Sequence, residues 1–392
     1  MFIVIPDILQ KRPHPDIVVT RMAIIDAADL EQLDAALEEV PNSPGVFMVY
    51  VREGAPYLAR TGLLRRRLLR LLRDRDKPSR LLNLRQSVVR LEYWLAGSRL
   101  ASAMQMYELA RTHFPGEYLD YLHLRFPPYL KVLAGNEFPR CQITTHLRPS
   151  RSLYYGPFRN RGSAENFENE FLDLFQIRRC QEDLAPSPAH PGCIYGEMGK
   201  CLRPCQEAVS REEYAGEVER VTEFLRTGGA SLLDNAIAAR DRLSAEMEFE
   251  QAARQHKRAE KIEEMMRARD PLARHVDQLH AIAVLPSCRA GAAEVAFLRA
   301  GHWFGLFDLT FELGEGRPVT LDRRLREMIE AQVWTPQPAR ERQERLAIVA
   351  RWFYSGWCDG ELLLFDDWER VPFRKVVNAI ARAAKGSIEA HA

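Results

Sequence analysis

Residues 180–205 read CQEDLAPSPAHPGCIYGEMGKCLRPC and hold four of the seven cysteines of this 392-residue chain, at Cys180, Cys193, Cys201 and Cys205. The Pro, Gly and Ser between them oppose regular structure, so the loop needs something other than an apolar core to hold its shape. Four thiols in one loop favour a metal centre. The spacing Cys-x12-Cys-x7-Cys-x3-Cys lacks the Cys-x2-Cys pairs of a zinc ribbon, which favours a four-cysteine cluster over zinc. Reduced cysteines in a coil are the remaining alternative.

The composition is that of a globular protein. Hydrophobic residues make up 46% of the chain, and its length suggests about two to three domains with cores of their own. No run approaches the roughly 20 apolar residues that span a membrane. The first residues also lack the basic start and the cleavage site of a secretory signal. We therefore expect a cytoplasmic protein without a membrane partner, in which the thiols stay reduced and metal ligation is favoured over disulfides.

The periodicity of the chain predicts an α+β fold. Residues 46–51 and 57–60 are short apolar strands, and the loop between them has a length that suits an antiparallel hairpin. After the cysteine loop, residues 211–266 are rich in helix formers and end in an antiparallel helix pair. Three alternating stretches after this pair predict a small β-meander. Beyond the meander we expect helices, such as one over residues 371–384.

These elements divide the chain into five parts. Residues 1–28 contain only a weak strand or an arm. The expected parts are an N-terminal extension (1–40), a small mixed α/β domain (41–135), a linker with the Cys-rich metal-binding segment (136–210), a helical hairpin region (211–270) and a C-terminal α/β region with the meander (271–392).

The overall charge of +1 hides a strongly basic stretch. Residues 60–90 hold eleven Lys or Arg against two Asp, a local charge of +9, on a predicted amphipathic helix whose other face is leucine. Such one-sided charge is typical of a surface that neutralises nucleic-acid phosphates, and a solvated charged surface is the alternative. The arginines that we predict to contact phosphates are Arg60, Arg65, Arg66, Arg70 and Arg73.

Several short segments resemble a known family. Residues 44–47, 57–61 and 64–67 read PGVF, YLART and LRRR, and they are similar to the start of a GIY-YIG nuclease domain of the UvrC type. Downstream segments follow in the order and spacing of UvrC, so the resemblance covers roughly residues 40–360. These segments are FPPYLKV (126–132), EFPR (137–140), YYGPF (154–158) and FQIRRC (175–180). The resemblance implies that the four cysteines of the loop hold a [4Fe-4S] cluster.

The resemblance also implies a catalytic set, from which this chain departs. GIY-YIG hydrolysis uses a tyrosine pair, an arginine and a glutamate that binds one divalent ion. Tyr57 and Arg67 stand at the positions of the second tyrosine and the arginine, whereas Phe47 replaces the first tyrosine. Met106 stands at the metal-ligand position, and a thioether is a poor ligand for Mg²⁺. We therefore expect no intact phosphodiesterase site and a catalytically impaired protein.

An active structure-specific endonuclease is the alternative function. It would take its Mg²⁺ or Mn²⁺ ligand from Glu108 or Glu92. Glu108 lies two residues beyond Met106, and positions two apart point to different faces of a helix. A third hypothesis is a zinc-stabilised protein-interaction module that binds no nucleic acid, and the +9 stretch argues against it.

The helix pair carries a further motif of the family. Its Phe-Glu-x-Ala-Ala sequence, formed by Phe249, Glu250, Ala252 and Ala253, is similar to the UVR motif by which UvrC contacts UvrB through a like hairpin. The alternative is a hairpin that packs only on its own chain. The residues after the meander are too few for the RNase H-like nuclease of UvrC. The sequence therefore resembles UvrC without this nuclease, and we expect a DNA-binding protein of nucleotide excision repair with a UvrB-like partner.

Overall fold

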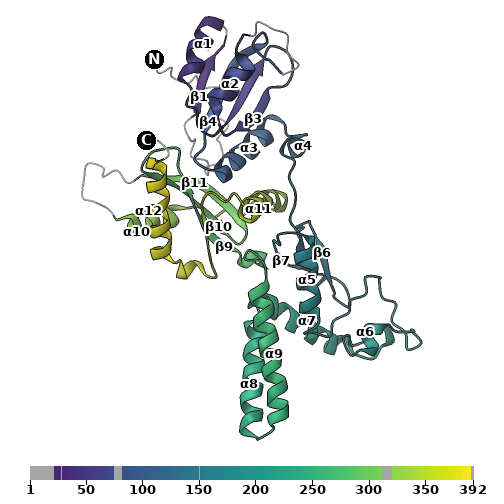
Figure 1. Cartoon of the computed structure of the whole chain (residues 1–392). Coiled ribbons are helices and arrows are strands. Elements are labelled where there is room, and N and C mark those ends of the chain that lie inside the picture. The colour runs from purple at the N-terminus through teal and green to yellow at the C-terminus, as the bar shows by residue number, and fades with distance from the viewer. Residues whose placement is uncertain (1–21, 28, 75–81, 150, 311–319, 390–392) are drawn as a thin grey trace.

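The computed structural model describes residues 22–27, 29–74, 82–149, 151–310 and 320–389. The fold is α+β, as the sequence predicts, and the described residues form three four-stranded antiparallel sheets with helices on their faces (Figure 1). Most of the arm predicted over residues 1–28, and part of the basic stretch, at 75–81, lie outside the described residues. No helix in the described ranges is long and apolar enough to span a membrane.

The first sheet has the strand order β1-β4-β2-β3. Its strands are β1 (Met22–Asp26), β2 (Gly45–Val51), β3 (Tyr57–Thr61) and β4 (Val88–Leu95). The predicted hairpin is therefore confirmed as β2 and β3, while the weak N-terminal strand pairs with β4. Gly45 is required where β2 begins, because a Cβ atom there would lie 2.4 Å from the carbonyl oxygen of Trp94.

Helices cover both faces of this sheet. Because side chains alternate along a strand, Phe47 and Val49 face one side and Val46 and Met48 the other. The Phe47 face packs on α1 (Leu30–Glu39), which Asp29 caps, and on α2 (Leu64–Leu72). The Met48 face packs on α3 (Arg99–His113), which is followed by the short α4 (Tyr118–Leu122).

The middle of the chain forms a second sheet, with the order β6-β5-β7-β8. Its strands are β5 (Tyr129–Val132), β6 (Cys141–Thr144), β7 (Leu153–Gly156) and β8 (Arg274–His275). It packs on α5 (Arg161–Leu172) and α7 (Arg211–Arg226) through a cluster of aromatic rings that includes Tyr155, Phe167 and Phe224. Because β5 belongs here, this domain begins before residue 135, inside the range that the sequence assigns to the first domain.

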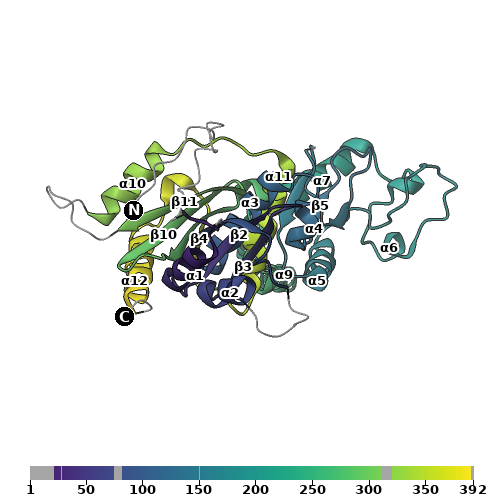
Figure 2. The ribbon, with the colours of Figure 1, turned by 90° about the horizontal axis from the view of Figure 1, so that it is seen from above.

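Two segments project from the middle domain, the cysteine loop and a helical hairpin. The cysteine loop contains the short helices α6 (Ile194–Glu197) and η1 (Pro204–Gln206). It lies at the end of the molecule opposite to α10 (Leu321–Ala331), a helix of the C-terminal region (Figure 2). The predicted helix pair is confirmed as α8 (Ala230–Ala245) and α9 (Phe249–Ala268), which run side by side as a long protruding hairpin (Figure 1).

The third sheet contains the predicted meander. Strands β9 (His280–Pro286), β10 (Ala292–Arg299) and β11 (His302–Thr310) confirm it. A fourth strand, β12 (Glu361–Phe365), pairs with β9 and was not expected from the sequence. Helices α10 and α12 (Phe373–Glu389) pack on one face of the sheet, and α11 (Ala339–Tyr354) on the other.

The first and third sheets share one apolar core. Met48 and Trp94 of the first sheet belong to the same buried cluster as Ala283 and Trp303 of the third, with α3 and α11 between the two sheets. This shared core fixes α11 against α3, and so packs the C-terminal region on the N-terminal domain.

Candidate nucleic-acid interface and cysteine centre

The structure brings together three of the residues at predicted catalytic positions. The rings of Phe47 and Tyr57 lie side by side on the α2 face of the sheet, with 6.1 Å between their centroids. Arg67, on α2, donates a hydrogen bond from Nη2 to the Tyr57 hydroxyl oxygen at 3.0 Å. The Phe47 side chain is fully buried, and a phenyl ring can neither donate nor accept a proton. The site therefore keeps the phenol of Tyr57 and the guanidinium of Arg67, but it has a phenyl ring where the first tyrosine of the pair belongs.

Met106 occupies a different environment. It lies on α3 and packs against the core that includes Met48, on the face of the sheet opposite to Phe47. Its thioether supplies no carboxylate for a hard cation such as Mg²⁺.

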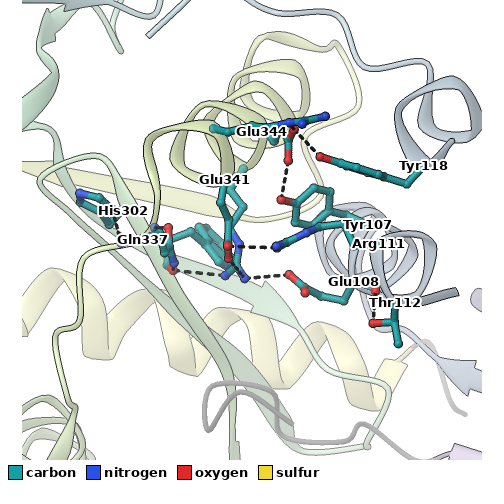
Figure 3. A network of polar contacts seen from close by, with 12 residues as sticks. Tyr107, Glu108, Arg111, Thr112, Tyr118, His302, Gln337, Glu341 and Glu344 are labelled. Atoms are coloured by element: carbon teal, nitrogen blue, oxygen red, sulfur yellow. Dashed lines mark hydrogen bonds and ion pairs between the residues drawn. The ribbon is translucent and has the colours of Figure 1, made fainter. Parts of the chain in front are cut away.

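Both carboxylates of the alternative endonuclease are held by arginines. Glu108 forms an ion pair with Arg345 of α11, with 2.9 Å between Oε1 and Nη2 (Figure 3). Glu92 lies buried on β4, where it forms an ion pair with Arg90 and accepts a hydrogen bond from the Tyr50 hydroxyl at 3.0 Å. A metal ion would have to displace an arginine from either carboxylate, so neither is ready to act as a ligand.

The Glu108 ion pair belongs to a buried polar network between α3, α4 and α11 (Figure 3). Glu344 of α11 accepts hydrogen bonds from the hydroxyls of Tyr107 and Tyr118, at 2.8 and 2.7 Å. Burial, followed by the hydrogen bond and the charge of Glu344, raises the pKa of Tyr118 to about 12. Glu341, also of α11, pairs with both Arg345 and Arg111. The network joins distant parts of the chain, and its charged members give no local sequence signal that they are buried.

Helix α2 has the predicted amphipathic character. Its four leucines at 64, 68, 71 and 72 are buried, which confirms the predicted apolar face. Arg66, Arg70 and Arg73 are exposed. Arg65 is half-buried and donates from Nε to the carbonyl oxygen of Val40 at 2.6 Å, so the loop before β2 holds it. Arg60, on β3, is exposed next to α3, on the other face of the sheet. The five predicted arginines therefore divide between two surfaces.

The four cysteines of the loop are free thiols that influence one another. Burial raises the pKa of Cys201 to about 11, with further contributions from the other three thiols, and burial also raises the pKa of Cys205. In the described residues, no three His, Cys, Asp or Glu side chains converge closely enough to form a metal site by geometry alone.

Hydrogen-bond donors reach two of these sulfurs. The backbone N–H of Arg203 donates to the sulfur of Cys201 at 3.4 Å, and the Arg178 guanidinium donates to that of Cys180 at 3.5 Å. Four thiols in one loop, with N–H groups directed at two of them, are a donor set whose chemistry suits a metal–thiolate centre.

The predicted partner-binding residues lie at the tip of the α8–α9 hairpin. Phe249, Glu250 and Ala253 are exposed, with Phe249 at 66% of its full accessibility, whereas Ala252 is buried between the two helices. Next to them, Met247 at the turn is exposed to 77%. The tip therefore presents two large apolar side chains to solvent.

Comparisons with known proteins match this chain to one family model and to several curated proteins. The model of the UvrC/Cho excinuclease middle domain matches residues 127–224, which contain β5 to β7, the cysteine loop and most of α7. UvrABC system protein C of Moorella thermoacetica is 27% identical over 325 residues, which cover 82% of this chain and 53% of that protein. The corresponding protein of Lachnospira eligens is 22% identical over 287 residues (72% and 47%), and that of Dehalococcoides mccartyi strain BAV1 is 25% identical over 285 residues (70% and 46%).

The chain thus spans about half the length of the curated relatives it matches. No solved structure matches it. The middle-domain match and these relatives, which cover 70–82% of this sequence, show that the chain is similar to UvrC proteins over most of its length.

Proposed function

We propose that this chain is a DNA-binding protein of nucleotide excision repair that holds DNA by its phosphates and does not cleave it at the GIY-YIG-like domain. The observation that carries this proposal is the environment of the position where the resemblance puts the metal ligand. Met106 offers no carboxylate there and lies on the opposite face of the sheet from the Tyr57–Arg67 pair, and Glu108 is already neutralised by Arg345. Without a carboxylate to hold a divalent ion, the remaining Tyr57–Arg67 pair lacks the group that polarises the phosphate.

The exposed face of α2 supplies the phosphate contacts. Arg66, Arg70 and Arg73 are accessible there, while the leucines of the other face anchor the helix. Such contacts give affinity that depends on salt and hardly on base sequence. A mobility-shift measurement with labelled duplex DNA in the presence of EDTA tests this part. We expect binding without a metal ion in solution, and an absence of binding would contradict the proposed function.

The cysteine loop holds a [4Fe-4S] cluster, with zinc as the runner-up. The ligands would be Cys180, Cys193, Cys201 and Cys205, and the donors from Arg178 and Arg203 would stabilise the negative charge on two sulfurs. When bound, the metal centre neutralises four thiolates, and its binding energy becomes folding energy of a loop with little regular structure. The cluster therefore has a structural role in the middle domain.

The α8–α9 hairpin binds a UvrB-like protein through its tip. The support is the exposure of Met247 and Phe249 at the end of a protruding hairpin, where neither side chain contributes to the core. Titration of the chain with purified UvrB tests this part, with Phe249→Ser as the variant. We expect weaker binding and unchanged stability, because Phe249 is largely exposed; unchanged affinity would remove the hairpin tip from the interface.

A further inference from the structure

A groove lined by arginines runs beside α11. It consists of two cavities, of about 650 and 290 Å³, that share Arg351 and Ser355 near the C-terminal end of this helix. The larger cavity lies against the middle domain and the smaller one against α3, α4 and β3. Six arginines line the two cavities, and we refer to this surface as the arginine groove: Arg60, Arg99, Arg125, Arg159, Arg161 and Arg351.

The arginine groove contains no acidic lining residue. Within the ranges that the structure describes, no carboxylate forms an ion pair with Arg60, Arg99 or Arg351, and all three side chains are exposed to solvent. Arg161 pairs with Glu165, and Asp359 accepts a hydrogen bond from the backbone N–H of Arg99. The pKa of Arg60 is lowered, first by partial desolvation and then by the positive charges of Arg351 and Arg99. Like charges that face one cavity repel one another, and a polyanion with several charges removes this repulsion.

Aromatic side chains accompany these charges. Trp357 is exposed to 68%, and the guanidinium of Arg99 lies over its ring, 5.1 Å from the centroid. Tyr121 lines the smaller cavity and is also exposed, and Arg159 stacks on Tyr354 in the larger one. Arginines beside accessible aromatic rings are the combination that binds single-stranded nucleic acid, because the cations follow the backbone while the rings stack on bases.

The size of the arginine groove agrees with this ligand. Its two cavities have volumes typical of small-molecule sites, roughly 300–1,000 Å³, which suits individual nucleotides of one strand rather than an intact duplex. Met106 forms part of the lining, where its thioether adds no negative charge. The Glu344 and Arg345 network holds α11 against α3 and keeps Arg351 opposite Arg60.

We propose that the arginine groove binds a single strand of nucleic acid, with its phosphates at Arg60, Arg99 and Arg351 and a base stacked on Trp357. This inference rests on the proposed DNA binding and adds a second surface to it, separate from α2. Duplex DNA contacts α2, and a strand separated from its complement enters the arginine groove.

The test compares two labelled probes, an oligothymidylate of about 20 nucleotides and a duplex of the same length, with the whole chain. The groove variant combines Arg99→Gln and Arg351→Gln. The matched control combines Arg323→Gln and Arg326→Gln, which remove the same charge from exposed ion pairs on α10. We expect the groove variant to bind the single strand about tenfold more weakly and to reduce its salt slope by about 1.4, while its duplex affinity and the control stay unchanged.

A second variant changes no charge, and because it replaces an exposed side chain we do not expect it to affect folding. Trp357→Ala removes an exposed ring, and we expect it to weaken single-strand binding about tenfold with the salt slope unchanged. If the wild-type chain binds the duplex but both variants bind the oligothymidylate like the control, the inference about the arginine groove is wrong and the proposed function stands. If the wild-type chain binds neither probe, the proposed function fails and the inference fails with it.

Discussion

Glu108 on α3 and Arg345 on α11 form an ion pair, with 2.9 Å between Glu108 Oε1 and Arg345 Nη2. The Arg345 side chain is only 7% exposed, and it also pairs with Glu341, at 2.6 Å. This relationship gives Glu108 a structural role, because the carboxylate compensates a buried cation that joins the first and third sheets.

The first prediction concerns this ion pair. Arg345→Gln leaves Glu108 and Glu341 without their shared cation, and we expect it to lower the free energy of unfolding by about 3 kcal/mol. Glu108→Gln should cost only about 1 kcal/mol, since Arg345 keeps Glu341. Urea denaturation measures both, with Arg323→Gln, in an exposed ion pair, as a control that costs about 0.3–0.5 kcal/mol. Equal losses for all three variants would show that the network does not join the sheets.

The second prediction concerns a buried carboxyl group. Glu294 on β10 is 2% exposed, and neither of its side-chain oxygens has a hydrogen-bond partner among the described residues. Burial, with a smaller contribution from Asp308, raises its pKa to about 8. The folded state therefore keeps the proton in a range where the unfolded chain has lost it, so stability should fall as the pH rises from about 4.5 to 8.

The Glu294→Gln variant tests this prediction. A neutral amide cannot ionise, so we expect the variant to retain at pH 9 the stability that it has at pH 6, whereas the wild type loses stability over the same interval. Thermal melts at both pH values measure the difference. Parallel losses in the two proteins would show that Glu294 does not account for the pH dependence.

Much of the local structure could be predicted from the sequence, because its cause is local. The leucine face of α2, the β2–β3 hairpin and the meander follow from periodicity over a few residues. Strand β12 was missed because the short run of leucines at 362–364 becomes a strand only through its partner β9, which lies far away in the chain.

The site was harder to predict than the elements. The residue types at Phe47 and Met106 indicate what the catalytic positions lack, but no spacing reveals that Arg345 neutralises Glu108 or that Val40 holds Arg65. The arginine groove was missed for the same reason, because its residues come from five separate segments that only the tertiary fold brings together.

The third prediction concerns the exposed face of α2. We expect Arg66→Gln with Arg73→Gln to reduce the salt slope of duplex binding by about 2, because each arginine neutralises about one phosphate. Arg65→Gln is the matched control, since Val40 holds this side chain, and it should leave the slope unchanged. Fluorescence anisotropy over a series of salt concentrations measures all three proteins. A slope that changes only in the Arg65 variant would place the phosphates on the other side of the helix.

The fourth prediction concerns the cysteine loop. Protein purified without oxygen should be brown, and Cys201→Ser should remove the visible absorbance, because the loss of one of four thiolate ligands breaks the cluster. Cys358→Ser is the control, since this exposed cysteine lies outside the loop. A colourless protein with one zinc ion per chain would show that the loop binds zinc instead of a cluster. A protein without metal would contradict the proposed centre.

Incision of labelled nicked and branched DNA with Mg²⁺ or Mn²⁺ measures whether the chain is a nuclease. We expect the chain to bind these substrates and to produce no more cleavage than Tyr57→Phe, because Met106 and the ion-paired Glu108 leave no carboxylate for the metal ion. Metal-dependent cleavage by the wild type that Glu108→Gln or Glu92→Gln abolishes would contradict this expectation, and would show that one of these glutamates leaves its arginine to bind the metal ion.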